Sequence, residues 1–224
     1  MKTVGPPYSG KLNVRWDEKG MIGRSAMAPS HSFTLDALAH CKTEEEAQQL
    51  LAELTIRFKE CGLELHPGKT KIVYCKDGSR RKHYPNKSFN FLGYTFQSRP
   101  CKNTKHNSMF MNFTPAVSKD ALKSMRATTR KYDLRNRTDL SLSDIARWYN
   151  PTLQGWLNYY GKYSRSALYP VWRHFNRTMV AWAMRKYKPF KNRKTRAAMF
   201  MERISHEQPR LFAHWRAGMI GAFA

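Results

Sequence analysis

Apolar residues recur at helical spacing through residues 142–188. In the first half of this stretch they are Ile145, Trp148, Tyr149, Leu153, Trp156, Tyr159 and Tyr160. This period predicts amphipathic helices. Asn150 followed by Pro151 predicts a break, because Asn caps helix starts and Pro fits the first helical position. We therefore expect a helix on each side of this pair and a third from about Leu168.

Shorter apolar runs precede this region. Residues 33–41 (FTLDALAHC) and 89–96 (FNFLGYTF) are typical of strands. Thr43 followed by Glu46 forms a capping box and predicts a helix after the first of these strands. Ser118 predicts the start of a basic helix, after which the chain is helical. Strands with one helix, followed by helices only, predict an α+β fold.

The third expected helix separates apolar from cationic residues. Its apolar side carries Val171, Trp172, Phe175, Met179, Trp182 and Ala183. Its other side carries Arg173, Arg177, Arg185 and Lys186. Helical apolar stripes usually pack inward, so we interpret Trp148, Trp156 and Tyr159 as core residues beneath the surface. The cations must face solvent, where they can neutralise RNA phosphates while aromatic and Arg planes stack on unpaired bases.

The charge of the chain points to the same class of partner. Forty Lys and Arg stand against sixteen Asp and Glu in 224 residues, giving a formal net charge of +24. Residues 1–100 hold 16 basic and 10 acidic residues, a net of +6, whereas residues 101–224 hold 24 and 6, a net of +18. An excess of this size favours a polyanion, most simply nucleic acid, bound by the second half of the chain.

Other classes of function find little support. The four cysteines, Cys41, Cys61, Cys75 and Cys101, form no Cys-x-x-Cys pair, so we expect no zinc site and mostly buried, reduced thiols. The eight histidines are scattered without metal-ligand spacing. No apolar run approaches the length of a membrane span and no secretory signal is present. We therefore expect a cytoplasmic protein that binds no membrane.

The stretch Leu142–Tyr160 resembles the maturase-specific domain of group II intron-encoded proteins. The resemblance lies in Asn150-Pro151, then Gln154-Gly155-Trp156, then Asn158-Tyr159-Tyr160. In that family the domain follows a reverse transcriptase and its thumb, and it binds intron RNA to promote splicing. Structured RNA, group II intron RNA in particular, is the partner that the resemblance implies, with DNA as a second polyanion left open.

Earlier motifs resemble the end of a reverse transcriptase palm. Residues 39–47 (AHCKTEEEA) look like the stretch after the polymerase hairpin, and residues 62–71 (GLELHPGKTK) look like the next family motif. In the family a Lys of this second motif lies near the incoming nucleotide, which makes Lys69 and Lys71 candidates for RNA contact. Residues 89–96, with Phe91-Leu92-Gly93, look like the primer-grip strand.

The resemblance divides the chain into four parts. Residues 1–32 are unassigned and expected to pack weakly, apart from a strand-like run at Lys11–Trp16. The other parts are a palm remnant at 33–114, a thumb helix with its connector at 115–140, and a maturase-specific domain at 141–224. The family's other palm elements find no match, so we expect a truncated member or one fragment of a split protein whose N-terminal reverse transcriptase part is separate.

The polymerase motif is degenerate. Alignment on His40-Cys41 places residues 33–36 (FTLD) over the family's Tyr-Ala-Asp-Asp. Leu35 stands in place of the first Asp, and Asp36 is the remnant of the pair. One carboxylate cannot hold the two divalent metal ions of nucleotidyl transfer. We expect no catalytic residue, metal site or cofactor in this chain alone; Mg²⁺ would be needed only if a partner restored polymerase activity.

Three hypotheses follow. The first is an RNA-binding maturase-like protein that assists splicing. The second is a reverse transcriptase active only with a missing fragment, and the third is a decayed product without a selected function. For the first, the expected RNA contacts are Lys69, Lys71, Lys123, Arg126, Arg130, Arg147, Lys162, Arg165, Arg173, Arg177, Arg185, Lys191, Arg193 and Lys194.

Overall fold

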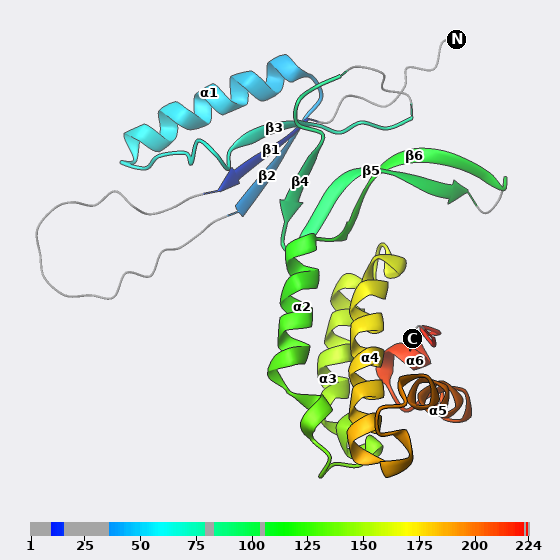
Figure 1. The fold of residues 1–224 in the computed structure, drawn as a ribbon. Helices are drawn as coiled ribbons and strands as arrows, with labels where there is room; N and C mark the ends of the chain where they lie inside the picture. The colour runs from blue at the N-terminus through cyan, green and yellow to red at the C-terminus, as the bar shows by residue number, and fades with distance from the viewer. Residues whose placement is uncertain (1–9, 16–35, 79–82, 104–105, 222, 224) are drawn as a thin grey trace, which may run out of the picture. The chain divides into compact units, whose positions relative to one another are not determined.

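A computed structural model describes residues 10–15, 36–78, 83–103, 106–221 and 223 (Figure 1). The fold is α+β, as predicted. The chain divides into two compact units, one of Met1–Phe91 with Phe96–Thr114 and one of Leu92–Thr95 with Pro115–Ala224. Among the described helices, none is long and apolar enough to cross a membrane.

Unit 1 contains a three-stranded antiparallel sheet in the order β2-β1-β3. Its strands are β1 (Gly10–Arg15), β2 (Asp36–Cys41) and β3 (Lys71–Tyr74). The central strand β1 lies in the segment that the sequence left without a domain, at the strand-like run predicted at Lys11–Trp16. The expected strand at 33–41 is described only from Asp36. Residues Phe33–Leu35, which were aligned with the polymerase motif, lie outside the described part of the chain.

Helix α1 (Glu44–Glu60) lies against β1 and β2. It begins as predicted, because the Thr43 side chain accepts a hydrogen bond from the Glu46 backbone N–H at 3.1 Å. Among the residues of α1, Ala47 and Phe58 are buried. The four cysteines are free thiols, and of these Cys41 and Cys75 are buried.

A second three-stranded sheet has the order β4-β5-β6. Its strands are β4 (Ser88–Phe91), β5 (Tyr94–Asn103) and β6 (Ser108–Val117). The prediction of one strand over residues 89–96 is therefore wrong. Leu92 and Gly93 both have positive φ, 47° and 77°, which makes the two-residue hairpin turn that suits the twist of paired strands.

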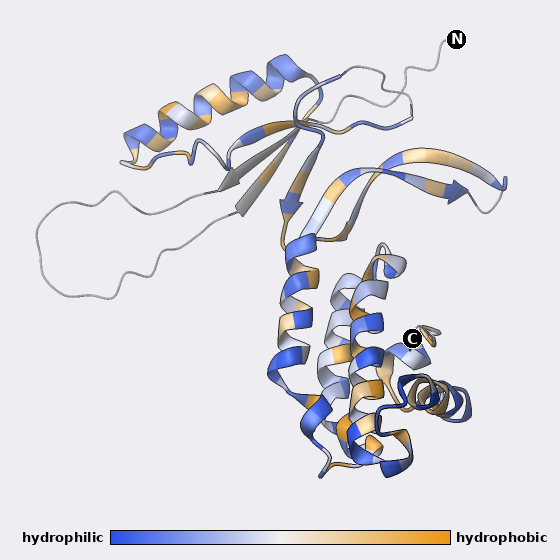
Figure 2. Ribbon diagram, in the orientation of Figure 1, coloured by the Kyte–Doolittle hydropathy of each residue, from blue (hydrophilic) through white to orange (hydrophobic). Residues whose placement is uncertain are grey.

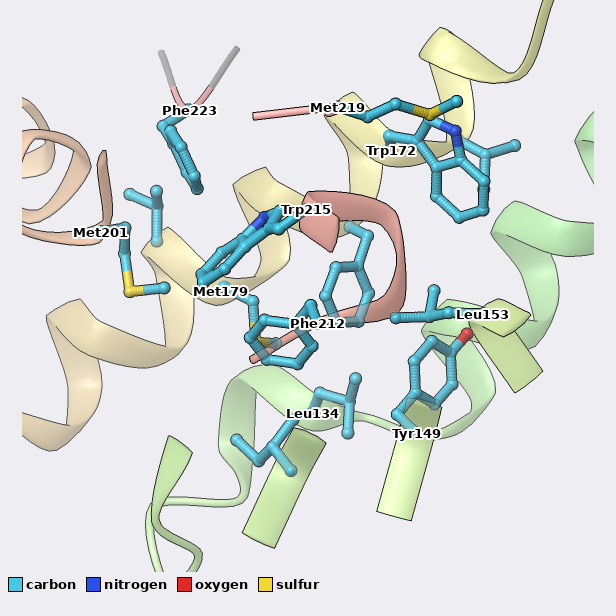
Figure 3. Packing of buried hydrophobic residues seen from close by; sticks show 14 of the residues in the cluster. Leu134, Tyr149, Leu153, Trp172, Met179, Met201, Phe212, Trp215, Met219 and Phe223 are labelled. Atoms are coloured by element: carbon cyan, nitrogen blue, oxygen red, sulfur yellow. The ribbon is translucent and has the colours of Figure 1, made fainter. Parts of the chain in front are cut away.

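Unit 2 is built from helices around one apolar core. The helices are α2 (Lys119–Lys131), η1 (Leu134–Asn136), α3 (Leu142–Tyr160), η2 (Arg165–Leu168), α4 (Tyr169–Lys186), η3 (Lys188–Phe190), α5 (Lys194–Glu207) and α6 (Ala213–Arg216). Figure 3 shows side chains of this core, including Tyr149, Trp172, Phe212 and Trp215. Ser118 caps α2 as predicted, and Ser141 caps α3 through a capping box with Asp144.

The Asn150-Pro151 pair does not end a helix, so the predicted break is wrong. Helix α3 is continuous from Leu142 to Tyr160, with Pro151 inside it. The Asn150 side chain instead binds the connection before α6: its Nδ2 donates to the Leu211 carbonyl and its Oδ1 accepts from the Ala213 N–H, each at 2.9 Å. Packing of α3 in the core thus outweighs the hydrogen bond that Pro removes.

A second polar group ties α4 to the C-terminal segment. Asn176 is buried; its Nδ2 donates to the Gly221 carbonyl at 2.8 Å, and its Oδ1 accepts from Trp215 Nε1 at 3.2 Å. The same oxygen lies 2.8 Å from His214 Nε2. Because the Trp215 N–H can only donate, the Asn176 oxygen faces it, and His214 Nε2 therefore carries the proton. Burial lowers the pKa of His214 to about 3.

We predict that Asn150→Ala lowers the free energy of unfolding by roughly 2–3 kcal/mol, because a lost hydrogen bond is costly when its partner stays buried. Chemical denaturation of the purified protein measures this difference. Asn158→Ala is the matched control on the same helix, since Asn158 is exposed and accepts only from the Gln154 side chain. Equal effects of the two substitutions would contradict the bridging role of Asn150.

We further predict that acid weakens unit 2 through His214. Its pKa is 6.5 as a free side chain and about 3 in the fold, so the unfolded state binds more protons between these values. The free energy of unfolding should therefore fall by about 2 kcal/mol between pH 7 and pH 5 from this residue. In denaturation experiments, the free energy of unfolding of His214→Phe should decline less over this pH range, by that amount. The exposed control His206→Phe should show the same decline as the unaltered protein.

Candidate nucleic-acid interface

Helices α2 and α4 pack together and bring arginines from both around one histidine. Arg126 and Arg130 lie one turn apart on α2, and Arg177 lies one turn after His174 on α4. Burial is the largest cause of the lowered pKa of His174, and the positive charges of these three arginines lower it further. The structure thus brings together three of the predicted RNA contacts, and His174 is a neighbour that the sequence did not single out.

Lys123 and Arg173 extend this basic face. Lys123 lies one turn before Arg126 on α2, Arg173 lies one turn before Arg177 on α4, and both are exposed. Figure 2 shows hydrophilic residues along α2. We call Lys123, Arg126, Arg130, Arg173, His174 and Arg177 the α2–α4 face.

Carboxylates are sparse near the α2–α4 face, and the acidic residue of α2 is Asp120 in its first turn. No Asp or Glu occurs between Ile145 and Met201, a stretch that covers most of α3 and all of α4. Among the described residues, Lys123, Arg126, Arg130 and Arg173 form no ion pair, whereas Arg137 and Arg203 pair with Asp139 and Glu207. Like charges gathered without counter-charges repel one another, and a bound polyanion relieves that repulsion.

The other predicted contacts of unit 2 are exposed but scattered. Arg147 of α3 lies 3.9 Å from Asp144 and its side chain is 83% exposed. Arg185, near the end of α4, donates from Nη1 to the Ala181 carbonyl at 3.2 Å. The remaining positions lie in connections between helices or at the starts of η2 and α5, and they are Lys162, Arg165, Lys191, Arg193 and Lys194.

The two other predicted contacts, Lys69 and Lys71, belong to unit 1. Lys71 begins β3 and is exposed, and Lys69 precedes it and is half-buried. Asp36, which the sequence alignment places over the second Asp of the polymerase motif, is the first residue of β2. In the described part of the chain, no three His, Cys, Asp or Glu side chains are grouped as metal ligands.

The interpretation of Trp148 and Tyr159 as core residues is wrong. Trp148 is 43% exposed and Tyr159 is 48% exposed. Trp156 is half-buried and packs between Tyr149 and Trp172, as expected. When the apolar stripe of a helix is wider than the core surface that covers it, the residues at the edge of the stripe stay exposed to solvent. The period of the sequence alone does not show which residues lie at that edge.

The Leu92-Gly93 turn belongs to unit 2 and packs on the end of α3. Tyr94 donates a hydrogen bond to the Tyr159 carbonyl, and the Tyr159 hydroxyl donates to the Leu92 carbonyl at 3.0 Å. The Tyr94 ring also contacts the rings of Tyr160 and Tyr163. Tyr163 is 59% exposed, with Lys162 Nζ 5.9 Å from its ring centre, so these tyrosines add an exposed aromatic surface beside a cation.

Gly93→Ala should destabilise unit 2 more than an ordinary substitution at positive φ. The conformation alone costs an Ala roughly 1–2 kcal/mol. A Cβ at Gly93 would lie 2.6 Å from Tyr160 Oη, so overpacking adds about 1–3 kcal/mol. Gly218→Ala is the control, because Gly218 has a φ of 80° and open space around a Cβ. Denaturation curves measure both, and a Gly93→Ala effect no larger than the control would contradict this packing.

Comparison with known proteins connects this geometry to a family. No curated protein matches the chain. The family model of the group II intron, maturase-specific domain, matches residues 122–200. The match begins in α2, which the sequence analysis assigned to a thumb, and continues through α3 and α4 into α5. Residues 122–200, which carry the α2–α4 face, are therefore similar to the maturase-specific domain of group II introns.

Proposed function

We propose that this protein is an RNA-binding, maturase-like protein that binds group II intron RNA and assists its splicing. The observation that carries the proposal is the coincidence of two features in one segment. Residues 122–200 match the maturase-specific domain, and the helices of the same segment bear the α2–α4 face, on which Lys123, Arg126, Arg130 and Arg173 form no ion pair with another described residue. A match in an uncharged segment would support the fold alone.

Two features of unit 2, one of them the α2–α4 face, suit RNA binding. The cations of the α2–α4 face come from two packed helices, so their spacing is set by the core and not by a flexible tail. Exposed aromatic residues in the same unit, Trp148, Tyr159 and Tyr163, offer planes on which unpaired bases can stack. Phosphate contacts supply affinity, and rigid spacing with stacking supplies a preference for RNA of one shape.

The proposal assigns binding and no polymerase step. Residues 33–36 retain Asp36 alone where the family has two adjacent carboxylates, and Leu35 offers no oxygen to a metal ion. Two-metal nucleotidyl transfer needs close carboxylates that hold both ions. A protein partner that supplied the missing carboxylates would be a separate chain. The proposed RNA binding does not require such a partner.

We predict that the purified chain binds a group II intron RNA more tightly than an unrelated structured RNA of equal length. Filter binding across a salt series measures both dissociation constants. Released counterions make each affinity fall with salt, but the preference should persist near physiological salt because it comes from shape. Equal binding to both RNAs, lost together as salt rises, would contradict the proposed function.

The double variant Lys123→Ala, Arg173→Ala extends this experiment. It should weaken binding to both RNAs and reduce the slope of log affinity against log salt by up to about 2, because two phosphate contacts are removed. Arg57→Ala, Arg203→Ala is the matched control, since these arginines pair with Glu60 and Glu207. An equal loss in the control would mean that net charge, not the α2–α4 face, binds RNA.

A further inference from the structure

A cluster of tyrosine rings joins the end of α3 to the turn between β4 and β5. The Tyr94 ring is buried at its centre and contacts the rings of Tyr159, Tyr160 and Tyr163, at centroid distances of 5.5, 5.3 and 5.7 Å. Tyr94 donates a hydrogen bond to the Tyr159 carbonyl, and the Tyr159 hydroxyl donates to the Leu92 carbonyl. These two hydrogen bonds hold the rings of the cluster in fixed orientations.

Tyr163 presents most of its surface to solvent. It is 59% exposed, and its hydroxyl forms no hydrogen bond with a described residue. Its ring meets the Tyr94 ring at 84°, and a perpendicular contact of this kind covers at most one face of a ring. Tyr159, on the other side of Tyr94, is 48% exposed, so the exposed rings form one patch and are not scattered singly over the surface. A ring that is held at its edge and open on a face suits a planar ligand, because little conformational entropy is lost on binding.

The surroundings of this open ring are cationic. Lys162 is exposed, its Nζ lies 5.9 Å from the Tyr163 ring centre, and it forms no ion pair with a described residue. The two segments that supply the rings, 78–119 and 145–201, contain no Asp or Glu, and Asp120, which follows the first of them, lies in the first turn of α2. A ligand of Tyr163 should therefore be planar and carry a negative charge, and a nucleotide has both properties.

We propose that Tyr163 and Lys162 bind one unpaired nucleotide of RNA, whose base stacks on the Tyr163 ring and whose phosphate contacts the Lys162 ammonium group. This inference rests on the proposed RNA binding and adds the state of the RNA at this site. The nucleotide must be unpaired, because a base within a duplex has both faces covered by its neighbours. The site accepts any base, since every base has a face that can stack. The α2–α4 face differs, because it contacts phosphates, which paired and unpaired RNA share.

Fluorescence anisotropy with two labelled probes tests this site. The probes are a single-stranded uridine oligonucleotide and a blunt RNA duplex with the same number of phosphates. Tyr163→Ala should weaken binding of the uridine oligonucleotide at least about fivefold and leave duplex binding nearly unchanged. Tyr163→Phe keeps the ring and should bind both probes as the unaltered protein does. Tyr169→Ala is the matched control, because Tyr169 is a 48% exposed tyrosine without a ring contact to a described residue.

Two further variants separate the base contact from the phosphate contact and from a structural role. Lys162→Ala should reduce the slope of log affinity against log salt for the uridine oligonucleotide by about 0.7, because one phosphate contact is lost. Tyr163→Ala should leave that slope unchanged. Tyr163→Leu fills the space beside Tyr94 but offers no planar face, so it should bind the oligonucleotide as weakly as Tyr163→Ala does, and its denaturation curve should show a folded protein.

Three results would overturn the inference. The first is undiminished binding of the uridine oligonucleotide by Tyr163→Ala and Tyr163→Leu, and the second is an equal loss for the oligonucleotide and the duplex. The third is an equal loss in Tyr169→Ala, because any exposed tyrosine would then serve. The proposed function fails on a different measurement, the preference for the group II intron RNA over the unrelated RNA, so the two failures are distinguishable.

Discussion

The position of helix α4 constrains the rest of unit 2. It packs against α2, α5 and the short helices η1, η2 and η3, and its buried residues include Trp172, Phe175 and Trp182. A helix covered on so many sides leaves a narrow strip of surface. Arg173 and Arg177 lie on that strip, so the same packing that stabilises the core fixes where the cations of α4 emerge.

Polar groups inside the core close the unit at its C-terminal end. Asn150 of α3 and Asn176 of α4 both bind backbone carbonyls of the segment after α5, at Leu211 and Gly221. Each side-chain amide forms hydrogen bonds with backbone groups, which apolar side chains cannot do. These hydrogen bonds are directional, whereas hydrophobic contacts are not. Burial of neutral His214 beside Asn176 couples this closure to pH.

The α2–α4 face gathers positive charges on this rigid core. Cations that repel one another destabilise a fold slightly, and their retention on packed helices is typical of a surface that meets a polyanion. The polyanion that we propose is RNA, because residues 122–200 are similar to the maturase-specific domain of group II introns.

The sequence by itself determined the α+β class, the helix starts at Thr43 and Ser118, and the cationic nature of the second half, because capping and charge are local properties. It located most of the predicted contacts on exposed positions for the same reason. Only the tertiary structure decided that Asn150 bridges to the segment before α6, that residues 89–96 turn at Leu92-Gly93, and that His174 lies among arginines of two helices. The contacts of Asn150 and His174 depend on residues far apart in the chain, whose meeting is set by packing and leaves no periodic trace in the sequence. The Leu92-Gly93 turn is local, but α3 contacts it, because the Tyr159 hydroxyl donates to the Leu92 carbonyl.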